Sequence, residues 1–308
     1  SVAAAASANL VGVVSLSGAA VLAFDGGQIA NVQSGSALSL AGSGAQVTNG
    51  AGSALLGLRN NYGALAFQGE ELDATGGAQA EIVGAFVNAG ALSVDSDGLS
   101  GGSHVVFDGA LANYGLTPSI AAAALAAVAT SGVTIGNNSL SHDTRVEAAS
   151  LLNEGALTIQ GSANDAVEAK LAIAGPARAA LTGEVTIAGD AALQYGGGAV
   201  GSVEYGSSLH LYGSGARFLS GDDSAFAATS VTNYGEIALD GEIADRGAGG
   251  AQLDFAGALV NFGQLQLDGS YGAAASLATV AGLLRNHGSV QLGAYGPGAP
   301  TSATALQA

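Results

Sequence analysis

The sequence predicts an all-β fold, a parallel β-helix of about 12 coils with roughly 25 residues in each. A short unit, Gly-x-h-x-h with h apolar, recurs twelve times along the chain. Within each unit apolar residues alternate with small or polar ones, which is the period of a strand with one buried face. Apolar residues make up 48% of the chain but aromatic residues only 5%, which suits a thin core repeated in layers.

Each copy of the unit is expected to begin one coil. The copies begin at Gly12, Gly35, Gly63, Gly90, Gly115, Gly132, Gly155, Gly183, Gly206, Gly235, Gly263 and Gly288. Many repeats contain two further short apolar pieces, such as residues 276–280 and 282–286. Three short strands joined by turns form one coil of a three-sided solenoid, and successive coils stack in parallel about 4.8 Å apart.

The last three coils show the expected division between core and surface. Inward positions are Ile237, Leu239, Leu265, Leu267, Val290 and Leu292. Outward positions are Glu236, Ala238, Gln264, Gln266, Ser289 and Gln291. Because the side chains of a strand point alternately to its two faces, the inward set should form layers of the core.

An Asn-x-Gly turn precedes many of the strands. The asparagines at this point are Asn61, Asn88, Asn113, Asn153, Asn233, Asn261 and Asn286. Stacked asparagine side chains can hydrogen-bond to one another from coil to coil, so we expect a structural ladder. The glycine suits a left-handed or otherwise strained turn that disfavours a Cβ atom.

The repeat after Gly115 departs from the Gly-x-h-x-h pattern, and the two terminal segments lack this pattern. Residues 116–131 contain Pro118 and a run of alanines, which predicts either a short helix near 118–130 or, as the favoured alternative, a coil with one irregular side. We expect a solenoid domain over residues 11–296. Residues 1–10 would be a cap or a donated strand, and residues 297–308 a tail.

The composition argues against several classes of function. The net charge is −17 and the basic residues are scattered, so no nucleic-acid partner is expected. The uncharged stretches 1–24 and 109–141 are interrupted by Gly, Ser and Asn, which argues against membrane insertion. Cysteine is absent, so disulfides and thiol chemistry are excluded. Methionine is absent even at position 1, so we expect a processed or excised chain.

Carboxylates supply the few candidates for chemistry. Asp240 and Asp268 fall at the same point of adjacent coils, roughly 5 Å apart, so they could act as an acid/base pair on a glycoside. The favoured alternative is that both are exposed turn residues. Asp95 and Asp97 resemble the start of a calcium loop but lack its later ligands, so they are weak metal candidates. Residues 142–147, "HDTRVE", are expected to form a solvated loop.

Histidine and aromatic residues suggest no cofactor. The four histidines lie in different coils, which argues against a transition-metal site. Tyr234, Phe262 and His287 occupy the position between Asn and Gly in three successive coils and should stack in a row. This row could contact sugars or a neighbouring rod, although self-stacking that stabilises the turn is the favoured interpretation.

The runs "ALVNFGQLQLDG", "SLLNEGALTIQG" and "SVTNYGEIALDG" resemble the haemagglutinin-type repeats of bacterial autotransporter passenger domains and two-partner-secretion exoproteins. The resemblance extends over about residues 10–293. It implies a right-handed β-helix, export from a Gram-negative-type cell and a secreted or cell-surface location.

These observations favour a non-enzymatic extracellular structural protein whose copies join end to end into a surface filament or layer. Both termini lack charged residues, whereas soluble solenoids usually have polar caps over their open strand edges. One alternative is a monomeric adhesin passenger that binds a glycan or a host protein. Another is a polysaccharide lyase or hydrolase.

Overall fold

The computed structural model describes residues 8–50, 52–70, 76–97, 101–114, 132–163, 167–241, 249–268, 275–293 and 305–307. These residues form parallel sheets stacked as a β-solenoid of about 10 turns, with no helix among them, which confirms the predicted parallel β-helix. Contacts divide the chain into two units, residues 1–157 and 158–308. The single solenoid domain over residues 11–296 stays a prediction, and the helix near 118–130 falls outside the described residues.

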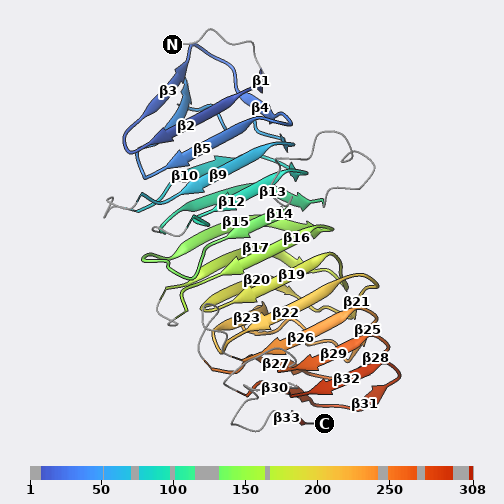
Figure 1. The fold of residues 1–308 in the computed structure, drawn as a ribbon. Coiled ribbons are helices and arrows are strands. Elements are labelled where there is room, and N and C mark those ends of the chain that lie inside the picture. Colours follow the sequence, from blue (N-terminus) through green and yellow to red (C-terminus); the bar gives the residue numbers. More distant parts are fainter. Residues whose placement is uncertain are drawn as a thin grey trace. The chain divides into compact units, whose positions relative to one another are not determined.

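In the first unit the repeated motif forms one parallel sheet, here called the motif sheet (Figure 1). Its strands are β2 (Val13–Ser17), β5 (Ala37–Ala41), β9 (Ala64–Gln68), β12 (Ala91–Val94) and β14 (Gly132–Ile135). Ala91 pairs with Ala64 on one side and with Gly132 on the other. Eleven of the twelve predicted copies form motif strands. The degenerate copy at Gly115 lies outside the described residues.

Two further sides complete the coils of the first unit. One set of strands is β1 (Ala8–Leu10), β4 (Ile29–Val32), β8 (Asn60–Asn61), β10 (Gln79–Ile82), β11 (Phe86–Asn88), β13 (His104–Asn113) and β15 (Thr144–Asn153). The other is β3 (Val21–Phe24), β6 (Gln46–Asn49) and β7 (Gly52–Ser53). Strand β13 pairs with both β10 and β11, so one long strand continues through two successive segments of the preceding coil.

The second unit repeats this plan. Its motif strands are β19 (Glu184–Ala188), β22 (Ser208–Tyr212), β26 (Glu236–Asp240), β29 (Gln264–Leu267) and β32 (Ser289–Leu292), while β16 (Ala156–Gln160) spans the division. Strands that lead into the motif are β18 (Ala180–Leu181), β21 (Ser202–Val203), β25 (Ser230–Asn233), β28 (Ala258–Asn261) and β31 (Leu284–Asn286). The remaining strands are β17 (Ala169–Ala177), β20 (Ala191–Gly198), β23 (Ala216–Ser220), β24 (Asp223–Ser224), β27 (Gln252–Phe255), β30 (Leu277–Val280) and β33 (Ala305–Gln307). The consecutive strands β27, β28 and β29 belong to three different sheets, so the coil has the expected three sides.

The core consists of aliphatic side chains stacked in register. Ile237 pairs with Leu265 and Leu265 with Val290, and both Ile237 and Leu265 are fully buried. Burying each such side chain contributes roughly 1.5–3 kcal/mol. Leu292 is 52% exposed, contrary to its assignment to the core, because no described strand pairs with the far edge of β32.

Ala238 also differs from its predicted environment, since it is buried rather than exposed. Its register partners on the two neighbouring strands are His210 and Gln266, whose side chains are much longer. The small methyl group therefore lies below the surface that these two side chains form.

Glycine has two different roles in the motif. At Gly235 and Gly263, which follow Asn-x, the backbone φ is not in the left-handed region, contrary to that part of the prediction. The restriction is steric, because a Cβ atom on Gly263 would overlap the carbonyl oxygen of Gly235 in the preceding coil. At Gly12 and Gly206, where no Asn-x precedes, φ is +100° and +74°, which favours glycine for conformational reasons.

Gly263→Ala should therefore destabilise the second unit. The methyl group would push two coils apart at a backbone contact, which we expect to cost about 1–3 kcal/mol, as for an overpacked core. Gly197→Ala is the matched control, because a Cβ atom there meets no atom within 4 Å and φ is not positive. Urea unfolding followed by circular dichroism measures both. Equal midpoints for the two variants would contradict the close-approach explanation.

Candidate functional site

The predicted asparagines form two ladders of side-chain hydrogen bonds. The first contains Asn61, Asn88, Asn113 and Asn153, and the second contains Asn233, Asn261 and Asn286. In each step Nδ2 donates to Oδ1 of the asparagine in the next coil, over 2.8, 3.0 and 2.7 Å in the first ladder and 2.8 Å twice in the second. The structure thus brings all seven residues into the arrangement that the spacing predicts.

The same amide groups also bind the backbone of the following coil. Nδ2 of Asn261 donates to the carbonyl oxygen of Ser289 at 2.9 Å, and Nδ2 of Asn61 donates to that of Ala91 at 2.8 Å. Both hydrogens of these amide groups are therefore used. Because unpaired polar groups are costly when buried, the ladders hold the turns in place, and the amide groups of Asn61 and Asn261 have no donor left for a ligand.

A third, shorter ladder was missed from the sequence. Nδ2 of Asn31 donates to Oδ1 of Asn9 at 2.7 Å, and Nδ2 of Asn60 donates to Oδ1 of Asn31 at 2.6 Å. These residues do not precede an x-Gly pair, so the motif search did not find them. Their spacing of one coil was the available signal.

Asp95, one of the two weak metal candidates, is a buried carboxylate whose oxygens are engaged by hydrogen bonds within the fold. It is 1% exposed, and its Oδ1 accepts hydrogen bonds from the backbone N–H of Gly69 at 2.6 Å and from Ser103 Oγ at 2.7 Å. Its Oδ2 accepts from the N–H of Ser103 at 2.9 Å and from Thr144 Oγ1 at 2.6 Å. Four donors thus bind its two oxygens, which leaves little capacity to coordinate calcium.

Asp268 repeats this arrangement in the second unit. It accepts from the N–H of Gly241 at 3.0 Å and from Ser276 through both Oγ, at 2.7 Å, and the backbone N–H, at 2.8 Å. Asp95 and Asp268 both end a motif strand, both precede their serine by eight residues, and both have positive φ, 51° and 54°. We call each arrangement an aspartate clamp. A Gly-x-h-x-h-Asp run with serine eight residues later is its signal in the sequence.

The clamp also corrects the interpretation of the carboxylate pair. Asp240 and Asp268 are 3% and 0% exposed, so the favoured alternative of two exposed turn residues is wrong. The three donors on Asp268 bind both of its oxygens, as expected of a structural group. An acid/base role would need one of these oxygens to reach a substrate.

Two other predicted features are the second weak metal candidate, Asp97, and the charged segment 142–147. Asp97 is exposed, and the described residues contain no group of three or more His, Asp or Glu side chains that could hold a metal ion. Residues 142–147 are not a solvated loop throughout, because Thr144 begins β15 and is 1% exposed.

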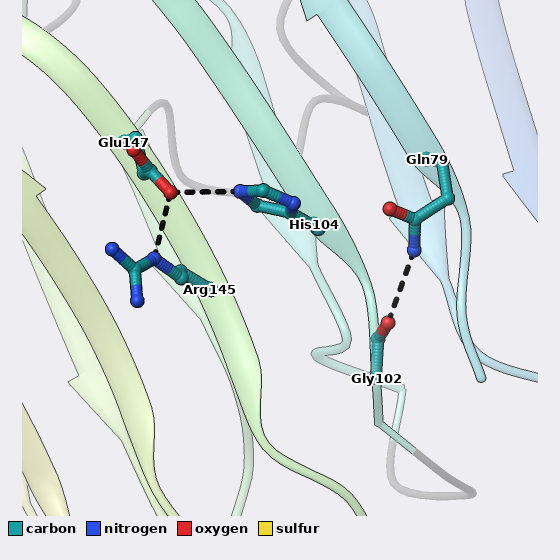
Figure 2. A network of polar contacts seen from close by, with 5 residues as sticks. All are labelled: Gln79, Gly102, His104, Arg145 and Glu147. Carbon is teal, nitrogen blue, oxygen red and sulfur yellow. Dashed lines mark hydrogen bonds and ion pairs between the residues drawn. The ribbon is translucent and has the colours of Figure 1, made fainter.

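A surface ion-pair cluster lies on β13 and β15 (Figure 2). Glu147 Oε1 is 2.9 Å from His104 Nε2 and 2.7 Å from Arg145 Nε. The hydrogen bond from His104 lowers the pKa of Glu147, with a smaller contribution from Arg145. The contribution of the ionised Glu147 to folding stability is present above the ordinary glutamate pKa, and it is lost as the pH falls through the lowered pKa. Because all three side chains are substantially exposed, that contribution is small.

The aromatic row forms as predicted and is stacked on itself. The ring centroids of Tyr234 and Phe262 are 5.5 Å apart with an interplanar angle of 9°, and those of Phe262 and His287 are 4.9 Å apart at 12°. Each ring face within the row therefore meets another ring, which agrees with self-stacking. The Tyr234 face turned away from Phe262 has no ring partner among the described aromatic contacts.

A groove of about 500 Å³ lies on the outer face of the motif sheet in the second unit. Its floor includes Glu184, His210 and Glu236, and the turns at Ser207 and Tyr234 border it. His210 Nε2 is buried and lies 3.4 Å from Glu236 Oε1, without the geometry of a hydrogen bond.

The first and last described motif strands are uncharged and have exposed apolar residues near them. Val11, Val13 and Val21 are 79%, 76% and 55% exposed near β2, and Leu283 and Leu292 are 56% and 52% exposed near β32. Residues 8–24 and 275–293 contain no Asp or Glu, although the whole chain has 24 of them. Each of these two strands has one edge without a partner among the described residues.

No protein-family model, curated protein or solved structure matches this chain. Within the described residues there is no helix of the length and apolar character that a bilayer crossing requires.

Asn261→Ala should destabilise the second unit through its neighbours. The substitution removes the Oδ1 that accepts from the buried Asn233 and the Nδ2 that donates to Asn286 Oδ1 and the Ser289 carbonyl, and we expect a loss of about 1–3 kcal/mol in all. Asn138→Ala is the control, since that side chain only accepts a hydrogen bond from the exposed Ser139. Thermal unfolding should show a clear loss for the first variant only. Similar melting temperatures would mean that the ladder contributes little.

Asp95→Asn tests the aspartate clamp. An amide group would present N–H donors where Ser103 and Thr144 already donate, so we expect a loss of about 1–3 kcal/mol or more. Asp108→Asn removes an equal charge from an exposed position and should change stability by less than about 0.5 kcal/mol. A chelator should leave the melting temperature of the native chain unchanged. A drop of several degrees on chelation would instead show that a metal stabilises the fold.

Proposed function

We propose that this chain is a non-enzymatic, extracellular structural protein whose copies join through their open motif-sheet edges. The observation that carries the proposal is the pair of uncharged, partly apolar strand edges at β2 and β32. Open strand edges readily pair with another chain unless they are covered or charged. Repulsion between copies that each carry a charge of −17 would be weakest at edges that lack carboxylates.

The two open edges belong to strands with the same sequence motif. Gly12 and Gly288 each begin a Gly-x-h-x-h unit, so aligning them places Val290 beside Val14 and Leu292 beside Leu16. This is the register that every described pair of adjacent motif strands with Gly-x-h-x-h spacing adopts, as in Leu265 beside Val290. A joint between β32 of one copy and β2 of the next would extend the layered core and cover the exposed part of Leu292.

A donated terminal strand is not needed for this joint. The described part of the N-terminal segment, β1, pairs with β4 of its own chain, and β33 of the C-terminal tail pairs with β30. The proposed contact therefore uses the motif strands rather than the terminal segments that the sequence favoured.

The polar interior supports a scaffold role. The asparagine ladders and the aspartate clamps use their hydrogen-bonding groups to hold one coil to the next. Groups engaged in this way are poor candidates for catalysis, which needs a donor or acceptor that can reach the substrate. The resemblance to haemagglutinin-type repeats supports export and a surface location.

Leu292→Glu tests the joint. A carboxylate at this edge would face the apolar Leu16 of the next copy, so fibres seen by negative-stain microscopy should be lost and the sedimentation coefficient should fall to that of a monomer. Adding Leu16→Lys should restore assembly, because the two charges would lie beside each other in the proposed register. Gln291→Glu, on the outer face of the same strand, should assemble normally.

The edge joint would be wrong if Leu292→Glu assembled like the native chain, or if Leu16→Lys failed to restore a well-folded Leu292→Glu protein. A native chain that stays monomeric at high concentration in physiological salt would refute self-assembly altogether. Circular dichroism on each variant shows that the coils are still folded.

A further inference from the structure

The groove on the motif sheet of the second unit is built from four adjacent strands. Register pairs place Glu184 beside Ser208, Ser208 beside Glu236, and Glu236 beside Gln264. These outward side chains form one row across β19, β22, β26 and β29. The row is perpendicular to the strands, and the groove above it has a volume of about 500 Å³.

A second row lies beside the first on the same strands. Here His210 and Gln266 flank Ala238, which is 3% exposed. Gln266 Nε2 donates to Glu236 Oε1 at 3.2 Å, and His210 Nε2 lies 3.4 Å from the same oxygen. Both long side chains therefore lean toward Glu236, and Ala238 between them is covered.

The groove is lined by hydrogen-bonding groups, and its charged side chains are acidic. Its lining includes two carboxylates, an imidazole, hydroxyl groups and an amide, and it contains no Lys or Arg. Such groups can both donate to and accept from the hydroxyl groups of a sugar. Uronic acids, sulfated sugars and sialic acids would be repelled, whereas neutral sugars would be tolerated and ammonium groups attracted.

Tyr234 provides an apolar platform at the border of the groove. Phe262 covers one face of its ring, while the side chain is 43% exposed and lines the groove. The face that carries no ring can accept the C–H surface of a sugar or, by cation–π attraction, an ammonium group. Tyr234 is thus the member of the aromatic row that can serve a ligand while the row remains self-stacked.

We propose that this groove binds an oligosaccharide of neutral or amino sugars that lies across β19, β22, β26 and β29. Tyr234 packs against one sugar ring, and Glu236, Ser208 and Gln264 bind hydroxyl or ammonium groups of its neighbours. The row crosses four strands, which suits an extended chain of sugars rather than a single one. The site does not rest on the proposed self-assembly, because no residue of β2 or β32 lines it.

Isothermal titration calorimetry with four defined hexasaccharides tests the proposal: β-1,4-linked glucose, N-acetylglucosamine, glucosamine and galacturonic acid. We expect binding of the glucosamine hexamer and of at least one neutral hexamer, and none of the galacturonic acid hexamer. Tyr234→Ala should weaken binding about tenfold, as expected for loss of a stacked ring. Glu236→Gln should weaken the glucosamine hexamer several-fold and the neutral hexamers less.

Glu81→Gln is the matched control, because it makes the same change at an exposed position on β10 in the other unit. It should leave every affinity unchanged. The proposal would be refuted if no neutral or amino hexamer bound at millimolar concentration, or if the galacturonic acid hexamer bound as well as the others. It would also be refuted if Tyr234→Ala, with a native circular dichroism spectrum, bound like the unaltered chain.

Discussion

The structure depends on the in-register parallel pairing of successive coils. Each strand lies about 4.8 Å from the next, so a paired strand residue lies directly beside the equivalent residue of the neighbouring coil. Side chains of one kind therefore stack on their own kind. Leu265 lies beside Ile237 and Val290, and Asn261 lies between Asn233 and Asn286.

This constraint explains which residue types the chain can use at each position. A leucine or valine gains from an identical neighbour by packing, and an asparagine gains because its amide is both donor and acceptor. An aspartate cannot stack with equal benefit on another carboxylate. Asp95 and Asp268 instead turn to serine and glycine N–H and O–H groups, with their backbone in the left-handed region. Glycine occupies the points where two coils approach most closely.

The same constraint distinguishes inward and turn positions, which hold the coils together, from outward positions of the motif sheet. Inward and turn positions are restricted by the neighbouring coil, and their polar groups are used within the fold. Outward positions of the motif sheet meet solvent, so they can vary without loss of packing. The groove lined by Ser208, Glu236 and Gln264 arises at such positions, on the outer face of the motif sheet. A regular scaffold can in this way acquire a binding surface through a few outward substitutions.

The sequence by itself determined the fold class, the motif strands, the two ladders of Asn-x-Gly asparagines and the aromatic row. These features repeat at one period, and a repeated local pattern needs no knowledge of distant contacts once the coils stack. It did not reveal that Asp95 and Asp268 are buried, because their partners Ser103 and Ser276 lie eight residues further along the chain. It also did not reveal the burial of Ala238 or the groove. Those features depend on which side chains of neighbouring coils meet, and only the tertiary structure decides that.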